Sequence, residues 1–262
     1  DGFYILMIGG TDMGTGCDTI LSQMAAECLD CELEDIIVSG VDTDTSPYDC
    51  GSYASSTTYV TGMAVVKTCE TLRGKICERG AEYLGCSPAD VEFDGKKVTN
   101  LKTGESISRK EIGNRVMCSS NEPLSANEAF SSPTSPPPFL AGIAEVEIDK
   151  ETGVVEMIDY AAVVDCGTVV NPNLARVQTE GGIAQGIGMA LYEDIVYNAK
   201  GRTTAIPLCS IRSRAGLTWG ISVWNSRAAM SLPDRLGQNQ SERALLIHHR
   251  RQYQTRSRMQ WE

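Results

Sequence analysis

The start of the chain places an apolar strand, a glycine-rich turn and a helix in direct succession. Residues 3–8 are apolar, residues 9–16 contain four glycines, and a helical pattern follows from about Asp18 to Glu27. Glycines let backbone amides come close to a ligand, and the N-terminus of a helix favours negative charge. This order of elements therefore predicts an α/β unit whose turn binds phosphate or another anion.

The length and the hydropathy pattern restrict the class of protein. A chain of 262 residues can form one large domain or two. No apolar run approaches the roughly 18 to 20 residues that cross a bilayer, and no basic-then-apolar export signal precedes the first strand. We therefore expect a cytoplasmic protein without a membrane partner. Because the chain begins with Asp1 and Gly2 and not with Met, we also expect it to be part of something longer.

The ten cysteines are scattered along the chain and are expected to be reduced thiols. Cys28 and Cys31 have the CxxC spacing, but neither a second pair nor a histidine follows at the spacing of a metal site. Two thiols at a helix end are favoured over a zinc site, so no metal ligand from the protein is predicted.

Two further strand–turn–helix units follow the first. The second has a strand at 35–40, a small-residue turn at 51–57 and a helix at 61–84. The third has a strand at 161–167, a turn at 171–173 and a helix at about 174–193. Repetition of one theme predicts a mixed α/β (α+β) fold.

The residues between these units predict hairpins and a connector. Strands at 91–93 and 97–99 flank Asp94 and Gly95, a strong turn signal. Residues 132–138 are rich in proline and read as a stiff, extended connector. Period-two alternation at 144–149, a turn and a partner strand at 154–160 predict an antiparallel hairpin.

The residue types point to cofactor binding more than to nucleophilic catalysis. The first 202 residues contain no histidine, so a Ser or Cys triad has no base. Small polar side chains instead gather at the turns that precede helices, where they serve as capping residues or as ligand contacts. They are Thr11, Thr15, Ser52, Ser55, Thr57, Gln178 and Gln185. The helix at 174–193 also holds Gly181, Gly182, Gly186 and Gly188, which indicates the close approach of a ligand or of another helix.

Four ordered motifs resemble the molybdenum-cofactor-binding subunit of the xanthine dehydrogenase and aldehyde oxidase family. They lie at residues 9–19, 49–57, 135–139 and 164–188, so the resemblance covers most of residues 1–202. It implies a fold of the molybdopterin-binding type and a molybdopterin cofactor, usually the cytosine dinucleotide form in bacterial members. Similar enzymes hydroxylate a heterocycle or aldehyde with oxygen from water. They pass the electrons to 2Fe-2S and FAD centres on partner domains or subunits.

The resemblance assigns cofactor contacts to specific positions. Met13, Gly14 and Thr15, with Gly16, match a pterin-contacting Met-Gly-Gln segment in which Thr15 replaces the commoner Gln. The family also has a small-hydroxyl loop and a glutamine-bearing helix at matching positions. These are represented here by Ser52, Ser55, Thr57, Gln178 and Gln185. No catalytic residue is assigned.

The resemblance also divides the chain. Residues 1–85 and 141–202 are expected to be two parts of a cofactor-binding lobe, with a peripheral excursion and the connector at 86–140 between them. The N-terminal half of the family's subunit is absent from the sequence and is expected as a partner. A segment that the family has near its C-terminus, Gly-Pro-Phe-Gly-Ala-Lys-Ser-Ile-Gly-Glu, is also absent. Its Glu acts as the base in similar enzymes.

The residues from about 203 onward differ in composition from the rest. Residues 203–262 carry nine Arg, no Lys and three acids, whereas residues 1–202 carry a net charge of −17. When plausible codons for residues 233–243 are read one base out of step, the missing Gly-Pro-Phe segment emerges. We therefore interpret residues 203–262 as an out-of-frame tail, which accounts for its basic charge without nucleic-acid binding.

The sequence thus predicts part of a molybdenum hydroxylase that acts on a purine or a related N-heterocycle, catalytically incomplete as written. Two alternatives stay open. One is a non-catalytic remnant that binds only a cofactor or a partner subunit. The other is a simple nucleotide-binding protein that uses the turn at 9–16.

Overall fold

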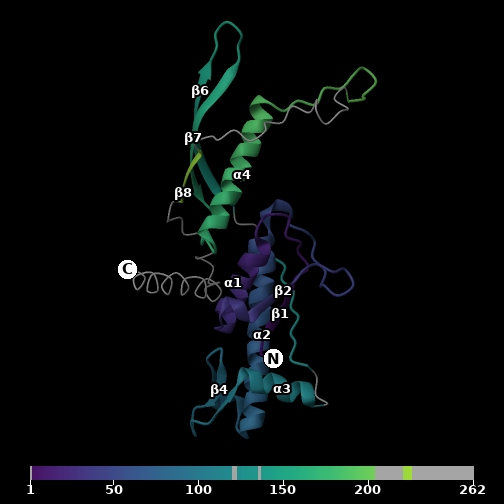
Figure 1. Cartoon of the computed structure of the whole chain (residues 1–262), viewed down its shortest axis with the longest axis vertical. Helices are drawn as coiled ribbons and strands as arrows, with labels where there is room; N and C mark the ends of the chain where they lie inside the picture. Colours follow the sequence, from purple (N-terminus) through teal and green to yellow (C-terminus); the bar gives the residue numbers. More distant parts are fainter. Residues whose placement is uncertain (1, 120–122, 135–136, 204–220, 226–262) are drawn as a thin grey trace. The chain divides into compact units, whose positions relative to one another are not determined.

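The computed structural model describes residues 2–119, 123–134, 137–203 and 221–225 (Figure 1). They form two compact units, one up to residue 134 and one from residue 137. Among these residues, no helix is both long enough and apolar enough to cross a bilayer. The ranges that the sequence suggested as domains stay a prediction.

The first unit begins with the predicted strand, turn and helix. Strand β1 (Tyr4–Met7) pairs in parallel with β2 (Ile36–Ser39), and helix α1 (Cys17–Leu29) connects them. Helix α1 ends at Asp30, whose left-handed φ of 53° lets its amide bond back to the last turn. The expected βαβ order is therefore confirmed.

Helix α2 (Gly62–Leu84) packs against α1 and is the central helix of this unit. Its buried side chains include Val65, Val66 and Ile76. A Cβ on Gly62 would lie 2.7 Å from Sδ of Met24, so this glycine permits the close approach of the two helices. The helix ends at Gly85, which has a left-handed φ of 66°.

A small antiparallel sheet covers the C-terminal half of α2. It consists of β3 (Val91–Phe93), β4 (Lys97–Asn100) and β5 (Ser106–Ser108), and helix α3 (Arg109–Cys118) follows. The hairpin predicted around Asp94 and Gly95 is confirmed, whereas β5 and α3 were not predicted. The core that the sheet, α2 and α3 share consists of Ile76, Phe93, Val98, Ile107, Ile112 and Val116. Residues 86–119 are therefore packed into the first unit.

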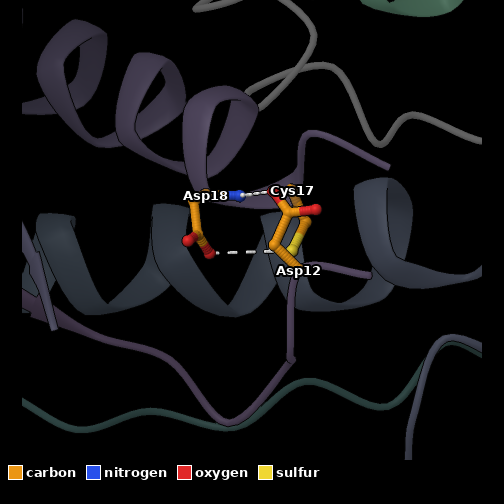
Figure 2. Close-up of side chains that lie close together, drawn as sticks. All are labelled: Asp12, Cys17 and Asp18. Carbon is orange, nitrogen blue, oxygen red and sulfur yellow. Dashed lines mark hydrogen bonds between the residues drawn. The ribbon is translucent and has the colours of Figure 1, made fainter. Parts of the chain in front are cut away.

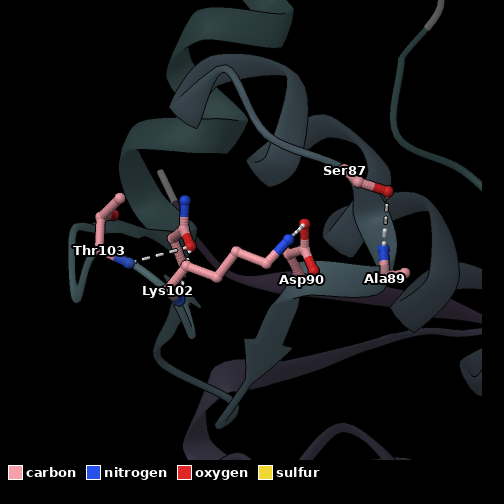
Figure 3. Close-up of polar contacts among 6 residues, drawn as sticks. Ser87, Ala89, Asp90, Lys102 and Thr103 are labelled. Carbon is pink, nitrogen blue, oxygen red and sulfur yellow. Dashed lines mark hydrogen bonds and ion pairs between the residues drawn. The ribbon is translucent and has the colours of Figure 1, made fainter.

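Short-range polar contacts hold the turns of this sheet (Figure 3). Lys102 forms an ion pair with Asp90 at 2.6 Å, and the Ser87 hydroxyl accepts a hydrogen bond from the Ala89 amide at 3.4 Å. The side-chain oxygen of Asn100 accepts a hydrogen bond from the Lys102 amide at 2.9 Å. These contacts stabilise the turns of the small sheet.

The described residues of the second unit form a sheet and one helix. Strand β6 (Phe139–Ile148) pairs antiparallel with β7 (Val155–Asp165), with a register shift between Glu145 and Val146. Strand β8 (Ile221–Asn225) pairs in parallel with β7, and helix α4 (Pro172–Leu191) contacts β8. The hairpin predicted here is confirmed.

Three details of the second unit differ from the sequence predictions. The strands expected at 154–160 and 161–167 are one continuous strand, because no glycine or proline interrupts the chain between them. The first strand begins at Phe139 and not at 144, so the extended backbone after the prolines joins the sheet. Strand β8, which the sequence did not predict, lies within the residues that we interpreted as an out-of-frame tail. Most other residues of the predicted tail lie outside the described residues.

Candidate functional site

The glycine-rich loop between β1 and α1 is organised by the carboxylate of Asp12. Its Oδ1 atom accepts hydrogen bonds from the amides of Gly14 and Gly16, at 2.9 and 3.1 Å. Its Oδ2 atom accepts a third from the amide of Asp18 at 3.3 Å. Gly14 and Gly16 have left-handed φ values of 100° and 78°, which turn their amides toward this carboxylate.

The loop therefore supplies its own anion. Slight burial raises the pKa of Asp12, but the amide hydrogen bonds outweigh it and lower the pKa below the usual 3.8. The amides of Gly14, Gly16 and Asp18, which lie where we expected a phosphate to bind, are occupied by this carboxylate. This arrangement argues against the nucleotide-binding alternative, which needs these amides for a phosphate.

Two predicted contact residues of this loop have different surroundings. The Met13 side chain is 70% exposed and packs in no core. The Thr15 hydroxyl oxygen is buried close to the Cys17 thiol. Burial raises the pKa of Cys17, as do the neighbouring carboxylates of Asp12 and Asp18, so this thiol stays protonated at neutral pH.

The predicted hydroxyl loop lies between β2 and α2 in the same unit. The Thr57 hydroxyl donates to Oγ of Ser52 at 2.7 Å, while Ser55 is exposed. Ala54 and Ser55 both have left-handed φ values, 53° and 58°, a conformation that costs a non-glycine residue about 1–3 kcal/mol. A π-helical turn at Thr57–Thr61 follows directly. Strained backbone and π-turns concentrate at functional sites, so the loop has the features of a binding segment.

The two loops meet at Gly9 and Asp49. A Cβ added to Gly9 would lie 2.3 Å from the Pro47 carbonyl oxygen and 2.7 Å from Cβ of Asp49. Only glycine fits at such an approach. The structure therefore brings Met13, Gly14, Thr15 and Gly16 into the same unit as Ser52, Ser55 and Thr57, on loops that touch. Sequence reasoning did not single out Asp49, because an aspartate before a turn is ordinary in any protein.

The remaining predicted contact residues belong to the second unit. Gln178 and Gln185 both lie on α4 and are exposed, seven residues or about two turns apart on one face. Gly181 and Gly182 lie between them, and within the described structure a Cβ added to either would meet nothing within 4 Å. Within the described residues of the second unit, Gly181 and Gly182 therefore have space beside them for a ligand or a partner.

One group of side chains has the composition of a metal site. Ligand atoms of Asp12, Cys17 and Asp18 lie within 4.8 Å of one another (Figure 2). The carboxylate of Asp12 is already engaged by amides, and the Cys17 thiol bonds to Asp18 at 3.8 Å. Cys28 and Cys31 belong to no such group within the described ranges. These contacts indicate that Asp12, Cys17 and Asp18 stabilise the loop.

Comparison with known proteins identifies the family. Residues 1–207 match the family model described as the molybdopterin cofactor-binding domain. The chain is 38% identical over 202 residues to the probable hypoxanthine oxidase XdhD of Escherichia coli (strain K12), covering 77% of this chain and 21% of that protein. It is 30% identical over 205 residues to the putative xanthine dehydrogenase molybdenum-binding subunit XdhA of the same organism, covering 76% and 27%.

Solved structures show the same fold. Quinoline 2-oxidoreductase from Pseudomonas putida 86 aligns with a TM-score of 0.72 at 23% identity, covering 86% of this chain and 30% of that one. CO dehydrogenase from Oligotropha carboxidovorans aligns with a TM-score of 0.69 at 24% identity, covering 84% and 28%. The mixed α/β fold predicted from the sequence is thus confirmed. The matched family model and the curated relatives show that the chain belongs to the molybdopterin-binding family of molybdenum hydroxylases.

Proposed function

We propose that the chain is the cofactor-binding part of a molybdenum hydroxylase that converts a purine or a related N-heterocycle with oxygen from water. The observation that carries the proposal is the contact between two loops, at 9–16 and 49–57, in a chain of this family. The purine class is supported by the relative named as a probable hypoxanthine oxidase. The chain covers about a fifth of that relative, so the activity of a whole enzyme is part of the proposal.

The residues of the first unit fit a pterin better than a free phosphate. The loop at 9–16 presents the exposed Met13, while the amides of Gly14 and Gly16 donate to Asp12. The loop at 52–57 presents hydroxyl groups on a strained backbone, of which Ser55 is exposed. Hydroxyls and amides suit the donor and acceptor edges of a neutral heterocycle.

The second unit is proposed to add Gln178 and Gln185 to the same cofactor. Both amide side chains flank an open glycine surface on α4, where a flat ring can lie close to the helix backbone. The bound molybdopterin, in its cytosine dinucleotide form, would supply the redox chemistry. The role of this chain is to bind and orient that group.

We further propose that the chain works with partner polypeptides. One is the N-terminal remainder of the molybdenum subunit, and the others carry the FAD and 2Fe-2S centres. In the first unit, one face of the β1–β2 sheet exposes apolar side chains: Phe3 by 57%, Ile5 by 68% and Ile37 by 51%. Neighbouring exposed apolar side chains of this kind mark interaction surfaces. We propose that the remainder of the molybdenum subunit covers this apolar face of the β1–β2 sheet. We also propose that the assembly is cytoplasmic.

The tail bears on whether this chain is catalytically complete. We propose that residues from about 203 onward are out of frame, so the Glu that serves as the base in similar enzymes is missing. The end of the family match at residue 207 supports this proposal. The alternative function, a non-catalytic remnant that binds a cofactor or partner only, follows if the frame change is genuine. The underlying DNA decides it, because codons incompatible with the Gly-Pro-Phe segment in the neighbouring frame contradict the frame change.

The proposal is tested on the purified chain from molybdenum-replete cells. Molybdenum is measured by mass spectrometry and pterin by fluorescence after oxidation, together with xanthine and hypoxanthine oxidation. Stoichiometric molybdenum and pterin are expected. Cofactor without turnover favours the remnant, and a chain with neither molybdenum nor pterin contradicts the cofactor assignment.

A further inference from the structure

Asp49 has contacts that its neighbours in sequence lack. Of residues 41–50, only Ser46 and Asp49 are partly buried, and the others are exposed. The Oδ1 atom of Asp49 accepts a hydrogen bond from the Gly51 amide at 2.7 Å. Its Oδ2 atom accepts one from the Thr61 hydroxyl at 3.1 Å, across twelve residues. One carboxylate thus joins the beginning of the hydroxyl loop to the start of α2.

The segment that Asp49 closes is the strained one. Ala54 and Ser55 lie between the two hydrogen-bonded ends, in left-handed conformations that the local sequence does not favour. Such a conformation persists only where surrounding contacts hold it. The bonds of Asp49 to Gly51 and Thr61 enclose this segment, and the Ser52–Thr57 hydrogen bond ties it internally.

Asp49 also sets the position of this segment against the other loop. Its Cβ atom lies where a side chain on Gly9 would be, and its Oδ2 atom lies 3.8 Å from the Cβ position of Gly10. A shift of Asp49 therefore moves the hydroxyl loop relative to the glycine-rich loop. Within the described ranges, only Asp49 accepts hydrogen bonds from both the Gly51 amide and the Thr61 hydroxyl.

We propose that Asp49 is a positioning residue for the cofactor: it closes the strained hydroxyl loop with Thr61 and fixes that loop against Gly9. The inference rests on the proposed function, because it assumes that these two loops hold the pterin. Asp49 itself acts through Ser52, Ser55 and Thr57, whose hydroxyls it keeps in one arrangement.

The test compares Asp49→Ala, Asp49→Asn and Thr61→Val in the full chain. An asparagine can still accept from the Gly51 amide and can donate its amide hydrogen to the Thr61 oxygen, so it is the conservative rescue. Asp42→Ala is the matched control, since the Asp42 carboxylate accepts a comparable turn hydrogen bond from the Asp44 amide and belongs to neither loop in sequence. Thr68→Val is the control for Thr61, because the Thr68 hydroxyl bonds only to the Ala64 carbonyl within α2.

Two readouts are measured beside the melting temperature. Hydrogen–deuterium exchange of residues 50–60 in the cofactor-free chain should rise by about tenfold in Asp49→Ala and Thr61→Val, since a closing hydrogen bond is lost. Molybdenum and pterin per mole of chain should fall by about fivefold in the same two variants. Asp49→Asn should keep more than half of both, and the controls should match wild type. A purely structural role would instead lower the melting temperature while the cofactor content of the folded chain stays unchanged.

Any one of three results overturns the inference. The first is equal hydrogen–deuterium exchange of residues 50–60 in Asp49→Ala and Asp42→Ala, and the second is an unchanged pterin content in Asp49→Ala. The third is an equal loss of molybdenum and pterin in Asp49→Asn and Asp49→Ala. The failure of the proposed function is distinguishable from these results, because it leaves wild type itself without molybdenum and pterin. In that case hydrogen–deuterium exchange still shows whether Asp49 closes the loop, but the role of Asp49 in cofactor binding is rejected.

Discussion

The carboxylate of Asp12 accepts a hydrogen bond from the amide of Gly16 at 3.1 Å, immediately before helix α1 begins. This relationship changes the meaning of the glycine-rich turn. The glycines do not leave the amides open for a phosphate; they direct them to a side chain of the same loop. The loop is therefore preformed before any ligand arrives.

Removing this carboxylate should destabilise the loop. Asp12→Ala loses three hydrogen bonds, and we expect a fall of about 2 kcal/mol in the free energy of unfolding, with about 1 kcal/mol for Asp12→Asn. The lowered pKa of Asp12 means that its stabilisation is present above about pH 4 and is lost as the pH falls through the lowered pKa. Urea denaturation at pH 7 and pH 3 measures both effects. A difference between wild type and Asp12→Ala that grows at pH 3 would contradict the assignment.

Replacement of Arg109 by lysine should destabilise the first unit. Its guanidinium pairs with Asp35 at 2.8 Å, donates to the Gly95 carbonyl at 3.1 Å and lies 4.8 Å from the centre of the Tyr4 ring. A lysine cannot make these contacts together, so Arg109→Lys should lower the free energy of unfolding by about 1–2 kcal/mol. The control is Arg176→Lys, which changes the i,i+4 pair of the exposed Arg176 side chain with Glu180 and should cost less than about 0.5 kcal/mol. Equal effects in chemical denaturation would refute the prediction.

Two glycines of α2 should respond in opposite directions to alanine. A Cβ on Gly80 would lie 2.7 Å from Val98, in the core beneath the small sheet, so Gly80→Ala should destabilise by about 1–3 kcal/mol. Gly74 has open space around the same position, and Gly74→Ala should stabilise by up to about 1 kcal/mol through helix propensity. Thermal melts of the two variants make the comparison. A stabilised Gly80→Ala variant would show that the sheet does not pack on α2 as described.

The thiols should differ widely in reactivity. Burial raises the pKa of Cys28 to about 11 and that of Cys69 to about 12, so at pH 8 only about one Cys69 in ten thousand is a thiolate. Cys50 and Cys118 are exposed. Iodoacetamide at pH 8, followed by peptide mass spectrometry, should modify Cys50 and Cys118 at least about a hundredfold faster than Cys69. Comparable rates would mean that the α1–α2 core opens readily.

Local patterns predicted the elements of this protein better than its contacts. The strand, turn and helix at the start, the hairpin at Asp94 and Gly95 and the hairpin of β6 and β7 all follow from periodicity and turn chemistry. Strand β5 and helix α3 were missed, because they are short and their apolar residues, such as Ile107 and Ile112, gain meaning only against α2. The split of β7 into two strands was wrong, because no glycine or proline interrupts the chain between them.

The sequence by itself determined the family and the order of the elements, since motif spacing and hydrophobic periodicity are properties of the linear chain. Only the tertiary structure decided that Asp12 occupies the amides of its own loop and that Asp49 ties Gly51 to Thr61 beside Gly9. These facts depend on the directions of amides and carboxylates in the folded loops. A turn at 9–16 and a turn at 49–57 come into contact only because β1 and β2 pair in parallel and α1 packs on α2.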